Sequence, residues 1–149
     1  MTDEQRQFLK DLQHELNTQD TVCQADPRFW VVTQDVTMRC TEDDGPDYYM
    51  MSVDGEWEDA IRVETKDYDI ARDIADSIDK YAVELSPVRV ERRIASDTMF
   101  LTLRECEEHI KRNHYHYNNP LPYAITAWRS PQVERLIEIL QTVDWDDVQ

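Results

Sequence analysis

The sequence predicts a single α+β domain of 149 residues, built on a mainly antiparallel sheet of about four strands with flanking helices. Three observations predict it: apolar residues at helical spacing near the N-terminus, a hairpin signal at Asp54-Gly55, and an amphipathic pattern over residues 67–82. The expected order is α-β-β-β-α-β plus a helical C-terminal appendix. We place an acidic α/β core at about residues 1–94 and the appendix at about residues 99–143.

The N-terminal part should hold one helix and three strands. Thr2 is a favourable N-cap, and an apolar stripe follows it until about Asn17: Phe8, Leu9, Leu12 and Leu16. The polar stretch 18–28 is expected to be a loop and residues 42–47 a turn. β-branched and aromatic residues predict strands over 29–38, 48–53 and 60–64, the last beginning as early as Trp57.

Residues 67–82 give the clearest helical pattern. One side of this helix collects the apolar residues Ile70, Ala71, Ile74, Ala75 and Ile78. The opposite side collects Asp69, Asp73, Asp76 and Asp79. We therefore expect the apolar side to face the sheet and the aspartates to face solvent.

The C-terminal part should contain a strand over 88–94 and two helices. The first follows the Thr102 to Glu105 capping box, with Leu103, Cys106 and Ile110 on one face. The second follows Ser130-Pro131 and carries a stripe expected to be buried: Val133, Leu136, Ile137 and Leu140. Between them, a loop over 114–122 leads to a strand or extended arm over 123–128. Residues 144–147 are expected to be a frayed acidic tail.

Charge and composition exclude several classes of function. The chain has 32 acidic and 16 basic residues, and residues 42–79 alone hold 14 acids against 3 bases, so direct nucleic-acid binding through a basic face is disfavoured. The two glycines, Gly45 and Gly55, exclude glycine-rich phosphate-binding loops, and no apolar run is long enough for a membrane span. A start without a leader pattern and three scattered cysteines, Cys23, Cys40 and Cys106, favour a cytoplasmic protein with reduced thiols.

The acidic helix predicts a contact surface. Asp69, Asp73 and Asp76 recur every 4.5–6 Å or so along a helix, a scale comparable to the spacing of nucleic-acid phosphates. The neighbouring hairpin adds Glu56, Trp57, Glu58 and Asp59. Such a surface could imitate DNA and occupy the basic groove of a partner protein. The alternative is a solvated face that serves only solubility.

A second pattern points to catalysis. Pro46-Asp47 followed by Glu64-Thr65-Lys66 resembles the PD-(D/E)-x-K nuclease signature. The resemblance implies that Asp47 and Glu64 would hold Mg²⁺ and that Lys66 would position the attacking water, with Glu15 as an additional acid. The surrounding negative charge disfavours a polyanionic substrate, so this Mg²⁺-dependent nuclease is the alternative function.

Four zinc-ligand types gather in the C-terminal part: Cys106, His109, His114 and His116. Their spacing, C-x2-H-x4-H-x-H, is not that of a standard zinc ribbon or finger. We expect packing and hydrogen bonding for these side chains. No metal or other cofactor is expected outside the nuclease alternative.

One stretch resembles known proteins. Residues 100–102, 109–110, 113–117, 123–131 and 134–140, including Tyr123-Ala124-Ile125-Thr126-Ala127-Trp128, are similar to the C-terminal part of small uncharacterised acidic phage and prophage proteins. The resemblance implies a phage origin and no catalytic residue. Small acidic phage proteins often inhibit host enzymes. The expected function is therefore inhibition of a host nucleic-acid-handling or defence protein, of the restriction or CRISPR type, in the bacterial cytosol.

Overall fold

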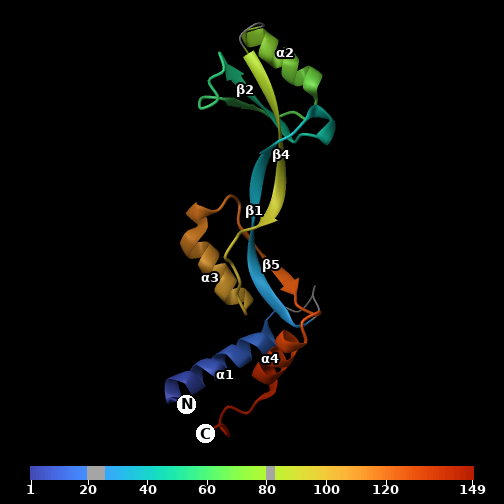
Figure 1. The fold of residues 1–149 in the computed structure, drawn as a ribbon. Coiled ribbons are helices and arrows are strands. Elements are labelled where there is room, and N and C mark those ends of the chain that lie inside the picture. The colour runs from blue at the N-terminus through green and yellow to red at the C-terminus, as the bar shows by residue number, and fades with distance from the viewer. Residues whose placement is uncertain (20–25, 80–82) are drawn as a thin grey trace. The chain divides into compact units, whose positions relative to one another are not determined.

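The fold is known from a computed structural model, which describes residues 1–19, 26–79 and 83–149. Over these residues the sheet has the strand order β3-β2-β4-β1-β5, accompanied by helices α1 to α4 (Figure 1). This confirms the α+β class with an antiparallel sheet. The chain order is α-β-β-β-α-β-α-β-α, so the expected appendix contributes a fifth strand. In the described part of the chain, none of the helices combines the length and apolar character needed to cross a membrane.

The chain divides into two compact units. Unit 1 comprises residues 1–34 and 93–149, and unit 2 comprises residues 35–92. The N-terminal helix therefore belongs to the same unit as the C-terminal helices, whereas the sequence placed it in the core of residues 1–94. The prediction of a single domain stays a prediction.

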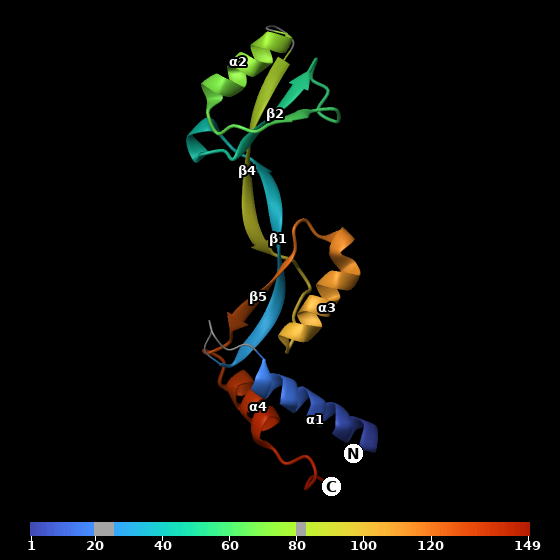
Figure 2. The same ribbon diagram turned by 180° about the vertical axis from the view of Figure 1, so that it is seen from behind.

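Two helices form a pair in unit 1, α1 (Asp3–Thr18) and α4 (Pro131–Thr142), which lie side by side in both views (Figures 1 and 2). The expected cap is present, because Thr2 and Gln5 form a capping box. On α4 the buried stripe is narrower than expected, since Ile137 is buried but Leu136 is 56% exposed. The acidic tail is not frayed: Lys10 pairs with Asp146 and lowers the pKa of that carboxyl.

The rest of unit 1 is a helix packed on two strands. The long strand β1 (Arg28–Arg39) pairs antiparallel with β5 (Leu121–Thr126), and α3 (Leu103–Asn113) covers them through a cluster that includes Trp30, Val32 and Cys106. Gln19 connects three elements here. Its side-chain carbonyl accepts hydrogen bonds from the Trp30 indole at 2.9 Å and from the Leu103 backbone N–H at 3.1 Å.

Unit 2 is a small sheet covered by one helix. Its strands are β2 (Tyr48–Val53), β3 (Ile61–Val63) and β4 (Val83–Ile94), with β2 paired antiparallel to both others. Helix α2 (Tyr68–Ile78) packs on this sheet. The buried core of the unit consists of Tyr49, Met51, Val63, Ala71, Ala75 and Val83. The helix thus contributes only alanines to this buried core.

Two expected boundaries in unit 2 differ from the sequence prediction. The return strand does not start at Trp57, because two successive turns separate β2 from β3: Glu56 N–H bonds to the Val53 carbonyl, and Ala60 N–H to that of Trp57. Only the first turn uses the Asp54-Gly55 signal, with φ of 55° and 76°. Helix α2 ends at Ile78, and the part of the predicted helix over residues 80–82 lies outside the described residues, as does most of the loop predicted over 18–28.

The close contact between α2 and the sheet predicts a strong size limit at Ala75. The Ala75→Leu substitution should destabilise the protein by about 1–3 kcal/mol, because three added carbons must enter a filled interface. Ser77→Leu places the same side chain on the exposed side of α2 and should change stability by at most about 0.5 kcal/mol. Urea unfolding of both variants checks this. Equal stability of the Ala75→Leu variant and the wild type would contradict the packing described.

Candidate functional site

The acidic residues of the predicted contact surface all lie in unit 2. Residues 35–92 contain 17 acidic and 7 basic residues, which makes this unit the more strongly charged one. Every carboxylate of the predicted contact surface belongs to an exposed residue: Glu56, Glu58, Asp59, Asp69, Asp73 and Asp76. Trp57 is half-buried, and the Arg39 guanidinium lies 5.2 Å from the centre of its ring. Below, these six carboxylates and Trp57 are called the acidic surface.

The local sequence explains how α2 positions its aspartates. Asp67 caps the helix by accepting hydrogen bonds from the backbone N–H groups of Asp69, at 2.8 Å, and Ile70, at 3.2 Å. Arg72 pairs with Asp76 at 2.9 Å and also donates to the Val83 carbonyl. Asp76 is therefore partly neutralised. Asp69 and Asp73 are exposed, and no ion pair joins either of them to another described residue.

A row of isoleucines on α2 is the feature that the sequence analysis missed. Ile70, Ile74 and Ile78 were expected to face the sheet, but they are 51%, 41% and 53% exposed. At 100° per residue the apolar arc of α2 spans about 140° from Ile70 to Ala75. A small sheet covers only the part of this arc that holds the two alanines. The sequence gives the width of this arc but no signal of how much of it the sheet covers.

The nuclease residues are brought only partly together. The Lys66 ammonium lies 3.8 Å from the Asp47 carboxylate. Glu64, however, is exposed and pairs with Arg62. Over residues 1–19, 26–79 and 83–149, no three acidic, histidine or cysteine side chains form a group that could hold a metal ion. The other candidate acid, Glu15, pairs with Arg104.

Asp47 has a structural role in unit 2. Its backbone N–H donates to the Val88 carbonyl at 2.8 Å, and its carboxylate accepts the Val90 backbone N–H at 2.7 Å. The side chain thus extends the β2–β4 ladder by one step before the start of β2. A buried or half-buried N–H without an acceptor is costly. The hydrogen bond to Val90 therefore explains the aspartate at this position without metal binding.

The candidate zinc ligands have other partners. Cys106 is fully buried with its sulfur 3.6 Å from the Val31 carbonyl, and burial raises the pKa of its thiol to about 11. The His109 ring bonds to the Tyr117 hydroxyl at 2.8 Å and packs against Phe100. His114 approaches the Lys111 carbonyl at 3.3 Å. The centre of the His116 ring lies 4.2 Å from that of the Tyr115 ring. These contacts account for the four side chains by packing and hydrogen bonding. Cys23 lies outside the described residues.

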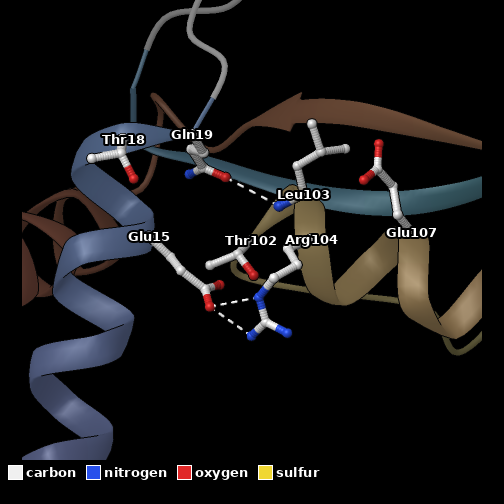
Figure 3. Close-up of a pocket in the computed structure, with 7 residues that line it drawn as sticks. All are labelled: Glu15, Thr18, Gln19, Thr102, Leu103, Arg104 and Glu107. Atoms are coloured by element: carbon white, nitrogen blue, oxygen red, sulfur yellow. Dashed lines mark hydrogen bonds and ion pairs between the residues drawn. The ribbon is translucent and has the colours of Figure 1, made fainter.

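A shallow pocket of about 280 Å³ lies in unit 1 where the end of α1 meets the start of α3 (Figure 3). Arg104 closes one side of it by donating to the Glu15 carboxylate at 2.6 Å. That hydrogen bond, with a second to Glu108, raises the pKa of the guanidinium above its usual value. The side-chain carbonyl of Gln19 accepts a hydrogen bond from the backbone N–H of Leu103. The polar groups of this pocket are thus largely satisfied within the protein.

Comparisons with protein-family models, with curated proteins and with solved structures find no match for the chain. The resemblance of residues 100–140 to phage proteins therefore stays a prediction. The acidic surface and the isoleucine row of unit 2 remain the features from which a function can be argued.

The structural role of Asp47 predicts a loss of stability when its carboxylate is removed. Asp47→Ala should lower the free energy of unfolding by about 1–2 kcal/mol, because the Val90 N–H loses its acceptor. Asp43→Ala, which removes an exposed aspartate nearby in the sequence, is the matched control and should have almost no effect. Both are measured by urea unfolding. If Asp47→Ala is as stable as the wild type, the side chain does not support the sheet.

Proposed function

We propose that the protein acts by contact, as an acidic protein of phage type that occupies the basic groove of a host protein. The partner would be a nucleic-acid-handling or defence protein of the restriction or CRISPR type in the bacterial cytosol, and the acidic surface would take the place of DNA. The observation that carries the proposal is the exposure of all six carboxylates of this surface within one compact unit.

The geometry of α2 supports imitation of a phosphate backbone. Asp69 and Asp73 are one turn apart, about 6 Å along the axis, and neither charge is neutralised by a described residue. Like charges at this spacing destabilise a helix by a few tenths of a kcal/mol. A cationic groove would remove that repulsion on binding. Long-range attraction would also accelerate association and make it sensitive to salt.

The proposal predicts that charge reversal on α2 abolishes binding. The triple variant Asp69→Lys/Asp73→Lys/Asp76→Lys should fail to capture a basic partner from bacterial lysate at low salt that the wild type captures. The wild-type complex should dissociate as salt is raised, and duplex DNA should compete for the partner. Captured proteins are identified by mass spectrometry, and the affinity of the purified partner is then titrated against salt.

The matched control reverses the same number of charges in unit 1. Glu4, Glu107 and Glu134 are exposed, so Glu4→Lys/Glu107→Lys/Glu134→Lys has the same net charge as the α2 variant. It should bind like the wild type. Circular dichroism verifies that both variants fold. Unchanged binding by the folded α2 variant refutes the proposal, and equal loss in the control would show that net charge alone is responsible.

One observation favours the alternative function, a Mg²⁺-dependent nuclease. Two residues of the PD-(D/E)-x-K signature, Lys66 and Asp47, lie 3.8 Å apart. The residues that would hold the ion are Asp47 and Glu64, and the ion would activate water. The fit is poor, because Asp47 is bound to the Val90 N–H and Glu64 to Arg62.

A cleavage assay decides the alternative. We expect no cleavage of plasmid or single-stranded DNA by the wild type with Mg²⁺ or Mn²⁺, because Glu64 is paired with Arg62. Glu64→Ala is assayed beside it to recognise a contaminating nuclease, whose activity would persist in the variant. Metal-dependent cleavage that disappears in folded Glu64→Ala would establish an enzyme and displace the contact proposal.

A further inference from the structure

The isoleucine row of α2 lies beside its aspartates. Relative to the buried alanines, Ile70, Ile74 and Ile78 come next around the helix, and Asp73 and Asp69 follow further out. Each isoleucine is at least 41% exposed. The solvent-facing side of α2 therefore carries an apolar ridge about 12 Å long, from residue 70 to residue 78, with negative charge along one flank.

The core of unit 2 does not require this ridge. Ala71 and Ala75 are completely buried and provide the contact of α2 with the sheet. Exposed apolar side chains that recur every fourth residue are unusual for a purely solvating face, which would carry polar residues instead. Three aligned isoleucines are suited to the i±4 packing of a second helix.

We propose that α2 docks against a basic amphipathic helix of the partner protein. The apolar side of that helix would cover the isoleucine row, and its Lys or Arg residues would pair with Asp69 and Asp73. The inference rests on the proposed function and defines the partner's contact element. It replaces a purely electrostatic contact by one with an apolar centre and a charged rim.

The charges exclude the other occupants of this ridge. A nucleic acid would be repelled by the aspartates and offers no matching apolar row. A second copy of α2 would bring its own aspartates against these. A wholly apolar surface would remove the aspartates from water without giving them partners, which is costly. A helix with both apolar residues and cations covers the isoleucines of the ridge and gives its aspartates partners of opposite charge.

Two synthetic peptides of 18 residues test the inference with the intact protein. Both contain the same leucines and lysines, but one arranges them as an amphipathic helix and the other is scrambled. We expect the wild type to bind the amphipathic peptide at least about tenfold more tightly, because only that peptide buries the isoleucine row. Affinities are measured by titration calorimetry at several salt concentrations.

Variants separate the apolar from the charged contribution. Ile70→Gln/Ile74→Gln should reduce the preference for the amphipathic over the scrambled peptide to about twofold or less. The affinity for the scrambled peptide should stay unchanged. Asp69→Asn/Asp73→Asn should weaken the binding of both peptides and make their affinities less dependent on salt concentration. The control Val133→Gln/Leu136→Gln removes two exposed apolar residues of α4, in unit 1, and should keep the full preference. Urea unfolding verifies that each variant is folded.

The outcomes distinguish this inference from the proposed function. If the wild type shows no preference, or if the isoleucine variant keeps it, the docking of a helix is wrong. If the aspartate variant still loses binding in that case, the acidic surface stands without the isoleucine row. If neither the isoleucine variant nor the aspartate variant changes the affinity for the peptides, α2 is neither a docking site for a helix nor part of the proposed contact surface.

Discussion

The contact of two alanines with a sheet determines the surface of unit 2. Ala71 and Ala75 are fully buried against Tyr49, Met51 and Val63, and side chains this small let the helix backbone approach the strands closely. Because that interface is filled by alanine, the isoleucines beside it cannot enter and stay at the margin of the helix. The aspartates are displaced further out. The proposed contact face is thus a consequence of how the helix packs.

A unit with 17 acidic and 7 basic residues needs internal compensation for its charge. Asp67 is used as a helix cap, Asp47 extends the sheet, and Asp76 is paired with Arg72. These carboxylates therefore contribute to the fold. Asp69 and Asp73 have no such role among the described residues. Of the three aspartates within α2, Asp69 and Asp73 are therefore the two without an ion-pair partner among the described residues, and they lie next to exposed isoleucines.

Local signals in the sequence predicted local structure well. The strand over residues 48–53, the cap at Thr2 and the proline start of α4 are all confirmed, because each depends on neighbouring residues. Features that depend on distant residues were missed. The bond from Val90 to Asp47 depends on strand register, and the exposure of the isoleucines depends on how much of α2 a small sheet covers. Periodicity locates the apolar arc of a helix, but it does not show how much of that arc the sheet buries.

The central claim is that partners contact the solvent-facing side of α2. Hydrogen–deuterium exchange, followed by mass spectrometry with and without bound amphipathic peptide, tests it directly. The account predicts that bound peptide slows exchange mainly in the fragments of the protein that span residues 68–78, with smaller effects over residues 56–59. Exchange in α1, α3 and α4 should be unchanged. Protection confined to unit 1, with α2 exchanging as in the free protein, would contradict the account.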